Sequence, residues 1–167
     1  MKFLFDTKPE SLLEARAKFE MAIKEDGMAC PCCDRWGKVY GYRVNSTMVR
    51  ALFWLFIAGK SDWINIQDKA PRFILRSKSL STMKYWNLVE RKPKEISDGK
   101  RFSGIWRITN DGIAFINRNL YINKKVFVFD DRVVGRSDEM VGVDDCLGNK
   151  FSYEELQVTR MIDERTY

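Results

Sequence analysis

The cysteines have the spacing most suggestive of chemistry in this chain. Cys30, Cys32 and Cys33 lie together in a Met-Ala-Cys-Pro-Cys-Cys segment, whereas Cys146 is far along the sequence. Thiolates at the Cys30-x-x-Cys33 spacing are able to hold zinc, but a structural zinc site needs four ligands. The chain has no histidine and no second cysteine pair, so Cys32 and Cys146 would complete a ligand set only with unusual geometry. We therefore expect a turn with buried or free thiols and no cofactor.

Zinc at Cys30 and Cys33 is the alternative interpretation of this segment. Redox catalysis at the same two residues has no support beyond the bare spacing, because no accompanying helix pattern is present.

The sequence lacks the motifs of common enzymes. It contains no histidine, which is the usual general base, and neither a phosphate-cradling loop nor a nucleophile elbow. Paired carboxylates do occur, but adjacent side chains point apart and form no ready ligand set for a divalent ion. We expect solvated turns, or a docking surface for a basic protein, and no enzymatic activity. The pairs are Asp130-Asp131, Asp138-Glu139, Asp144-Asp145 and Glu154-Glu155.

Positive charge is concentrated in the middle third of the chain. Residues 60–125 contain 15 Lys and Arg against 6 Asp and Glu, whereas residues 126–167 contain 5 against 10. A local basic field of this kind attracts phosphate groups. The sequence therefore favours a nucleic-acid partner, DNA in preference, over the alternative of a solubilising lysine surface without a ligand.

The composition is that of a folded protein with a hydrophobic core. Of the 167 residues, 45% are hydrophobic and 13% are aromatic. No segment approaches the roughly 20 apolar residues of a membrane span. Asp6 interrupts the apolar start, so Met1–Phe5 does not form a secretion signal. We expect no membrane partner and a cytoplasmic location.

The first 45 residues predict an amphipathic helix followed by the cysteine turn. Thr7 and Glu10 resemble a capped helix start, and Gly27 is suited to a stop, which gives a helix of about 18 residues. Polar and apolar residues alternate over 38–44, which indicates a strand. The apolar face of the helix consists of Leu12, Ala15, Phe19, Ala22 and Ile23.

A regular succession of short elements follows. The helix over 47–59 is apolar nearly all round, which predicts a central place in the core. Asn87 is suited to the left-handed residue that ends a helix, and Asp98-Gly99 is a strong hairpin turn signal. The predicted order is helix 47–59, strand 63–66, a helix opened by Asp68 and Pro71, a helix from Ser77 or Ser79 to Asn87, strands 88–92 and 104–108, and a helix capped by Thr109.

Large side chains in these elements are the candidate core. We expect Phe73, Ile74 and Leu75 to face inward from their helix. Four tryptophans lie within the apolar patterns and are predicted to be core residues and not base-stacking platforms, namely Trp54, Trp63, Trp86 and Trp106.

Two segments resemble MarR-like regulators, and the order of elements from Thr47 to Asn119 resembles the winged-helix order. Leu80–Arg91 is similar to the end of the family's recognition helix and its first wing strand, with Asn87-Leu88-Val89 in place of Gly-Leu-Val. Trp106–Gly112 is similar to the second wing strand and the helix start after it. Small phage-encoded proteins with a cysteine turn also resemble this arrangement. The resemblance implies an α+β fold, a winged helix-turn-helix core and DNA binding in regulation.

The resemblance also implies which residues touch nucleic acid. A recognition helix presents polar and basic side chains to base edges in the major groove, and a wing touches phosphates. Leu80, Met83 and Leu88 are expected to face inward, and an ordinary solvated helix face and hairpin tip are the alternatives. The predicted contact residues are Lys78, Ser81, Thr82, Lys84 and Tyr85 on the recognition helix, Arg91, Lys92, Lys94, Lys100, Arg101 and Arg107 on the wing, and Arg72 and Arg76 on the preceding helix.

The last third predicts an acidic, β-rich segment. Strands are expected over 126–129, 132–134 and 140–143, and Ser152 is suited to cap a terminal helix reaching about Arg165. The predicted division is an N-terminal helix and cysteine turn at 1–45, a winged-helix domain at 46–121 and the acidic segment at 122–167. MarR-like regulators dimerise through long terminal helices that this segment does not offer, so the oligomeric state stays open.

A second kind of partner fits the same sequence. A phage-type inhibitor of a host nucleic-acid machine, similar to an anti-CRISPR protein, would use the winged helix as a scaffold and bind a host protein through its basic or acidic face.

Overall fold

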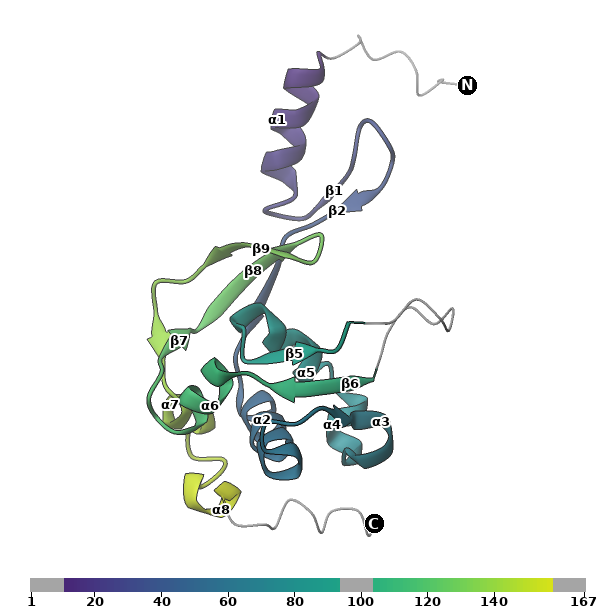
Figure 1. Cartoon of the computed structure of the whole chain (residues 1–167). Helices are drawn as coiled ribbons and strands as arrows, with labels where there is room; N and C mark the ends of the chain where they lie inside the picture. Colours follow the sequence, from purple (N-terminus) through teal and green to yellow (C-terminus); the bar gives the residue numbers. More distant parts are fainter. Residues whose placement is uncertain (1–10, 94–103, 158–167) are drawn as a thin grey trace. The chain divides into compact units, whose positions relative to one another are not determined.

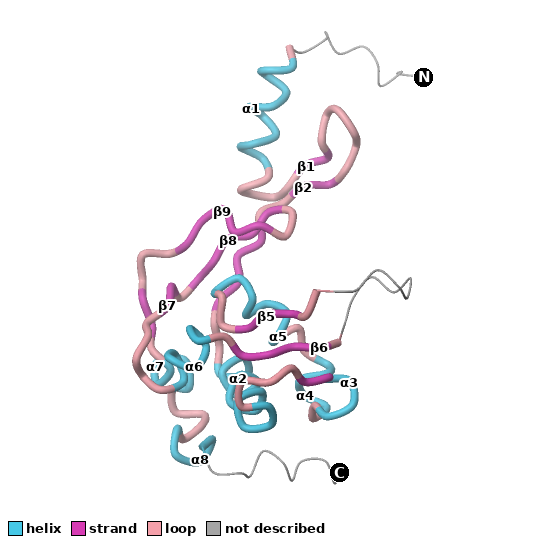
Figure 2. The backbone as a smooth tube through the Cα atoms, viewed as in Figure 1, coloured by secondary structure: helices cyan, strands magenta, loops and turns pink. Residues whose placement is uncertain are grey.

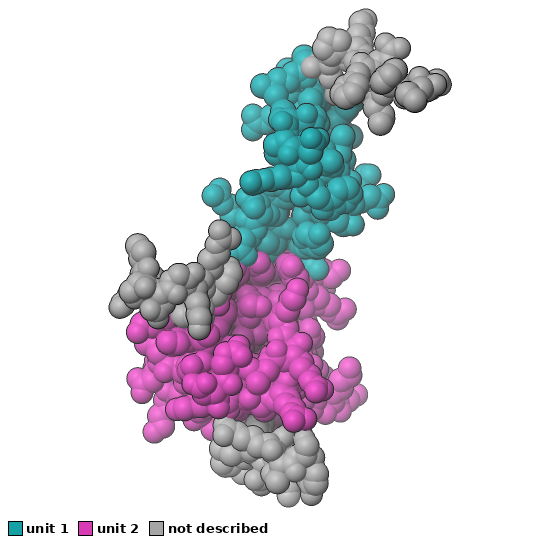
Figure 3. Space-filling model, turned by 90° about the vertical axis from the view of Figure 1, so that its right-hand side faces the viewer, with its two compact units in different colours: residues 1–41, 127–135 teal, residues 42–126, 136–167 magenta. Residues whose placement is uncertain are grey.

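The computed structural model describes residues 11–93 and 104–157, and it has the predicted α+β class (Figure 1). Helices alternate with small sheets of two or three strands (Figure 2). The contacts divide the chain into two units, coloured separately in Figure 3. Unit 1 comprises residues 1–41 and 127–135, and unit 2 comprises residues 42–126 and 136–167.

Unit 1 contains helix α1 (Leu12–Ala22) and a small hairpin made of β1 (Met28–Ala29) and β2 (Trp36–Gly37). The predicted helix start at Thr7 and Glu10 lies outside the described residues, within which α1 begins after Ser11. Ser11 is the N-cap, because its hydroxyl accepts from the Glu14 amide while the Glu14 carboxylate accepts from the Ser11 amide. Chain reversal begins after Ala22, whose carbonyl accepts a hydrogen bond from the Gly27 amide.

The core of unit 1 is small. Ala15 and Ile23 are buried on α1, and the Phe19 and Phe129 rings meet edge to face with centroids 6.3 Å apart. Leu12, although predicted to face inward, is 71% exposed. Unit 1 also holds ends of three strands that pair in the order β3-β8-β9: β3 (Tyr40–Arg43), β8 (Lys125–Phe129) and β9 (Arg132–Arg136).

Unit 2 is built around helix α2 (Ser46–Gly59), which confirms the predicted central helix. The Asn45 side chain caps it by accepting from the Met48 amide at 3.0 Å. Every side chain from Ala51 to Leu55 is buried, as expected for a helix apolar on all sides. On its half-buried side, the Arg50 guanidinium lies 4.5 Å from the Phe73 ring centroid and 4.4 Å from that of Phe151.

Short elements then surround α2. Strand β4 (Ile64–Asn65) is followed by α3 (Ile66–Lys69), α4 (Arg72–Arg76), α5 (Ser79–Met83) and the 3-10 turn η1 (Lys84–Trp86). The sequence predicted one helix where α3 and α4 are separate, since Ala70 and Pro71 adopt extended backbone. Ile74 is buried as predicted and Phe73 is half-buried. Leu75, although predicted to face inward, is 41% exposed.

A three-stranded antiparallel sheet packs against α2 in the order β4-β6-β5. Its strands β5 (Val89–Arg91) and β6 (Ile105–Ile108) lie side by side in Figure 2, with Val89 opposite Ile108. Asn87 adopts the predicted left-handed backbone, with φ of 59°. Thr109 caps α6 (Asn110–Ile116) as predicted, because its hydroxyl accepts from the Gly112 amide.

Of the predicted acidic segment at 122–167, described residues 127–135 belong to unit 1, and described residues 122–126 and 136–157 belong to unit 2. Strand β7 (Ile122–Asn123) pairs with β10 (Met140–Val141), and α7 (Val143–Leu147) and α8 (Tyr153–Gln157) pack on α2 within unit 2. Helix α7 replaces the end of a predicted strand. The change in charge near residue 125 reflects which side chains are exposed to solvent. The packing of α7 and α8 depends instead on the buried side chains of Val143, Leu147 and Leu156.

The tryptophan predictions hold for three of four residues. Trp54, Trp86 and Trp106 are buried, whereas Trp63 is half-buried. Within residues 11–93 and 104–157, no helix combines the length and apolar character that crossing a bilayer requires.

Candidate nucleic-acid interface

Helix α5 occupies the position of the predicted recognition helix. Leu80 and Met83 are buried, and Leu88 just beyond η1 is fully buried, which confirms the predicted inward face. That face packs on α2 and β5. The opposite face carries exposed Ser81 and Lys84. The helix is therefore fixed to the core by its apolar side and presents a polar side to solvent.

Thr82 does not belong to the polar side, which corrects its predicted outward orientation. Its side chain is only 6% exposed. The Thr82 hydroxyl donates a 2.8 Å hydrogen bond to the Lys78 carbonyl one turn earlier. Ser79 is buried as well, and its hydroxyl accepts from that of Ser77 at 2.8 Å. These two hydroxyls stabilise the short helix from within and are not available to a ligand.

A group of exposed cations lies just before and at the start of α5, and we call Arg72, Arg76 and Lys78 the α4–α5 cations. Arg72 and Arg76 are one helical turn apart on α4, so they share a face. All three side chains are exposed, and none forms a hydrogen bond or ion pair with another described residue. Their charge is therefore not neutralised within the part of unit 2 that the structure describes.

The cations at the base of the β5–β6 hairpin differ, and we call Arg91 and Arg107 the hairpin cations. Arg107 donates from Nε to the Glu90 carboxylate, and its guanidinium lies 4.4 Å from the Trp63 ring centroid. Arg91 is half-buried over the Trp106 ring at 5.3 Å, and this burial lowers the pKa of Arg91 below its usual range. Both predicted contact residues are thus already engaged by the protein.

The remaining wing residues are placed only in part. Lys92 is exposed at the end of β5. Lys94, Lys100 and Arg101 lie outside the described residues, as does the predicted Asp98-Gly99 turn.

A stacked tyrosine pair adjoins the polar side of α5. The rings of Tyr42 and Tyr85 are nearly parallel, with centroids 5.5 Å apart. Lys84 Nζ lies 5.0 Å from the Tyr85 centroid, and Arg136 donates to the Tyr85 carbonyl at 3.4 Å. Tyr85 was a predicted contact residue, but no sequence pattern links residues 42, 85 and 136. Only the folded chain brings them together.

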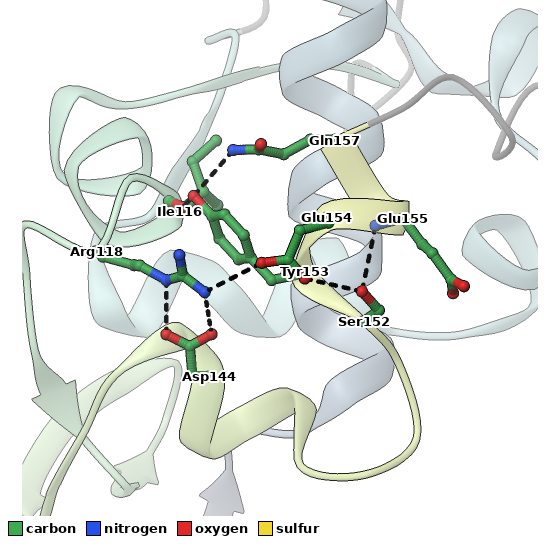
Figure 4. A network of polar contacts seen from close by, with 8 residues as sticks. All are labelled: Ile116, Arg118, Asp144, Ser152, Tyr153, Glu154, Glu155 and Gln157. Atoms are coloured by element: carbon green, nitrogen blue, oxygen red, sulfur yellow. Dashed lines mark hydrogen bonds and ion pairs between the residues drawn. The ribbon is translucent and has the colours of Figure 1, made fainter.

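A network at the other end of unit 2 fixes α6, α7 and α8 to one another (Figure 4). Arg118 holds the Asp144 carboxylate with two hydrogen bonds of 2.8 Å, and its guanidinium lies 3.7 Å from the Tyr153 ring centroid. The Tyr153 hydroxyl donates to the Ile116 carbonyl at 2.6 Å. The hydrogen bonds from Arg118 lower the pKa of Asp144 and raise that of Arg118. This network stabilises the unit by tying α6, α7 and α8 together through charged and hydrogen-bonded side chains.

A cleft of about 530 Å³ in unit 2 lies at the start of α2 and beside α7. Its walls carry both signs of charge, including Arg43 and Asp145, and Lys124 is paired with Glu139 at 2.6 Å. Burial raises the pKa of Cys146 to about 12, so this thiol stays protonated and unreactive near neutral pH. The cleft therefore offers no activated nucleophile.

The cysteine turn lies in unit 1. Cys30 is half-exposed, and Cys32 and Cys33 are exposed; all are free thiols. Among residues 11–93 and 104–157, no group of three or more Cys, Asp or Glu side chains is placed to hold a metal ion. The described residues therefore give no support to a zinc site at Cys30 and Cys33.

Comparison with known proteins returns no relative for this chain: no family model, no curated protein and no solved structure matches it.

Proposed function

We propose that residues 46–121 form a winged-helix domain that binds nucleic acid, duplex DNA in preference, and acts in regulation. The order α2, β4, α3 with α4, α5, β5, β6, α6 supports this proposal, because it has the succession of elements typical of that fold. The antiparallel sheet order β4-β6-β5, with β5 and β6 joined as a hairpin, also fits. In this arrangement α5 and η1 take the place of the recognition helix.

The exposed α4–α5 cations are the observation that carries the proposal. Arg72, Arg76 and Lys78 have no hydrogen-bonded or ionic partner among the described residues. A cation without a protein partner displaces counterions from a nucleic-acid backbone at little cost to the fold. The adjoining exposed Ser81 and Lys84 extend the same polar surface onto α5.

Binding in this proposal depends mainly on phosphate contacts. Helix α5 has only five residues, and the buried Thr82 hydroxyl is unavailable to a base. Ser81, Lys84 and Tyr85 are left as the short list of side chains able to reach base edges. Because phosphate contacts carry no direct sequence information, we expect modest discrimination between sequences.

A salt titration of the full chain tests the proposal. Fluorescence anisotropy with a labelled mixed-sequence duplex should give an affinity that falls as salt rises, with a logarithmic slope of roughly −3 to −5. The corresponding single strand serves as the comparison, and polyglutamate serves as a competitor that carries negative charge without phosphate. We expect that excess polyglutamate does not displace the protein from duplex DNA.

Two outcomes would overturn this proposal. Absence of binding to duplex and single strand at low salt would remove a nucleic-acid partner. Equal binding of polyglutamate and DNA would instead favour an acidic protein surface as the partner, which is the inhibitor-type alternative.

A further inference from the structure

The turn that joins β1 to β2 gathers three of the four cysteines into one small loop. The Cys30 amide donates to the Arg35 carbonyl at 2.8 Å, and the Asp34 amide donates to the Cys30 carbonyl at 2.9 Å. Asp34 adopts a left-handed backbone with φ of 57°. These two hydrogen bonds close the loop, so Cys30 and Cys33 belong to the same hydrogen-bonded turn.

Cys30 shares this closed turn with two further thiols, those of Cys32 and Cys33. The backbone amides of Cys32 and Cys33, and the thiols of both residues, act as donors toward the Cys30 sulfur. These donors stabilise negative charge on the sulfur and lower the pKa of Cys30. Cys33 is exposed, so the pair is open to solvent from the side of its second thiol.

The spacing also suits a bond between the two sulfurs. Residues three apart within a single turn have Cα atoms less than about 7 Å apart. A disulfide requires a Cα separation of roughly 4.4–6.8 Å. The closure of this turn by the Asp34 amide therefore brings Cys30 and Cys33 into the range in which a disulfide is feasible.

We propose that Cys30 and Cys33 form a thiol–disulfide exchange site that reacts with low-molecular-weight disulfides, with Cys30 as the nucleophile and Cys33 as the resolving thiol. The Cys30 thiolate attacks one sulfur of the small disulfide, which forms a mixed disulfide and releases one thiol after protonation. The Cys33 thiolate then attacks the Cys30 sulfur, which forms the Cys30–Cys33 disulfide and releases the second thiol. The two cysteines lose two electrons, and the small disulfide is reduced to two thiols.

The chain contains its own control for this reaction. Cys146 is mostly buried, and that burial raises its pKa to about 12, so its thiolate is scarce at neutral pH. Cys146 should stay reduced while the cysteine turn reacts. Cys32 shares the turn and the exposure of Cys33 but has no assigned step, so Cys32→Ser is the matched control variant.

Oxidised glutathione is the probe that tests the proposal on the full chain, with intact-mass and peptide-mapping readouts. The wild-type protein and Cys32→Ser should each lose two hydrogens and retain no glutathione, with the new bond between Cys30 and Cys33. Cys33→Ser should accumulate one glutathione on Cys30. Cys30→Ser should react at least about tenfold more slowly, because it lacks the stabilised thiolate. Unchanged circular dichroism of each variant shows that folding is not the cause.

Three results would overturn the assignment. Equal reaction rates for Cys30→Ser and wild type would remove Cys30 as the nucleophile. A disulfide that forms through Cys32, or that fails in Cys32→Ser, would remove Cys33 as the resolving thiol. Stoichiometric zinc in protein purified without chelators, with thiols that react only after the metal is removed, would make the turn a metal ligand in place of an exchange site.

Discussion

The two groups of cations in unit 2 carry the same kind of charge but have different surroundings. Arg91 and Arg107, the hairpin cations, lie over the rings of Trp106 and Trp63, and Arg107 is paired with Glu90. Arg72 and its neighbours, the α4–α5 cations, are exposed and have no hydrogen-bonded or ionic partner within residues 11–93 and 104–157. A partner must compete with protein contacts for the first group and only with water for the second.

It follows that the cations of one basic sequence segment do not all contribute equally to a binding surface. All five residues were predicted together as nucleic-acid contacts, with Lys78 on the recognition helix and the other four on the wing or the preceding helix. The folded chain assigns two of them to holding the β5–β6 hairpin against its neighbours. Replacing residues from each group separately is therefore the way to test whether the contrast matters for binding.

The largest effect is expected from removing the α4–α5 cations together. In the variant Arg72→Ala/Arg76→Ala/Lys78→Ala, affinity for duplex DNA at low salt should fall roughly 10- to 100-fold, because about three phosphate contacts are lost. The logarithmic salt slope should become shallower by about 2–3 for the same reason. Anisotropy titrations across a salt series measure both quantities.

A charge-matched control separates a local surface from overall charge. Lys24→Ala/Arg35→Ala/Arg132→Ala removes the same number of exposed cations from unit 1. The proposed interface predicts that this control binds within about twofold of wild type, since it loses only long-range attraction. Equal losses in the two triple variants would mean that net charge, and not the α4–α5 cations, governs binding.

A smaller effect on DNA affinity is expected when the hairpin cation Arg107 loses its carboxylate partner. Glu90→Gln removes the carboxylate that accepts from Arg107 while keeping nearly the same shape. Binding should tighten by about twofold to threefold, because the Arg107 charge is no longer neutralised by a neighbour.

Arg107→Ala should leave binding almost unchanged and lower the Tm by a few degrees, because it removes the Trp63 contact. A loss of binding in Arg107→Ala as large as in the α4–α5 variant would erase the contrast between the two groups.

The sequence predicted local structure well where a physical requirement lies within a few residues. Thr109 caps α6 through the Gly112 amide, and Asn87 ends η1 in the left-handed region. Gly112 is different, because its requirement comes from a distant residue: a Cβ there would overlap the Leu88 carbonyl oxygen. This close approach explains in physical terms why glycine stands at that position after the Thr109 cap.

The sequence predicted poorly what depends on distant neighbours. Nothing local reveals that Glu90 and Trp63 engage Arg107, or that Tyr42 stacks on Tyr85. Leu12 and Leu75 have apolar side chains in helices that offer no buried surface at those positions. The grouping of α7 and α8 with α2 likewise results from tertiary packing, which a change in charge along the chain does not report.

Thr82 distinguishes a stabilising residue from a contact residue on the same helix. Thr82→Val removes the hydroxyl that donates to the Lys78 carbonyl, which should lower the free energy of unfolding by about 0.5–1.5 kcal/mol. DNA affinity of the folded protein should stay within about twofold of wild type. Thr82→Ser keeps the hydroxyl and controls for shape. A large loss of affinity in Thr82→Val without a loss of stability would restore Thr82 to the predicted interface.

The smallest effect is expected at Arg118, which lies in the basic middle third of the chain and, like Arg107, is already paired with a carboxylate. Hydrogen bonds from Arg118 lower the pKa of Asp144 below its ordinary value of 3.8, so folding favours the carboxylate form. The resulting stability is present above pH 3.8 and is lost as the pH falls through the folded-state value. Asp144→Asn should therefore lower the Tm by about 1–3 °C at neutral pH, because the pair is largely solvent-exposed.

The difference in Tm between Asp144→Asn and wild type should shrink steadily below pH 3.8, where thermal melts by circular dichroism compare the two proteins directly. Because Arg118 also contacts the Tyr153 ring, it should stay in place when Asp144 is neutralised. DNA binding at neutral pH should then remain unchanged. Tighter binding in Asp144→Asn, comparable to that expected of Glu90→Gln, would show that the α6–α8 end of unit 2 also faces the nucleic acid.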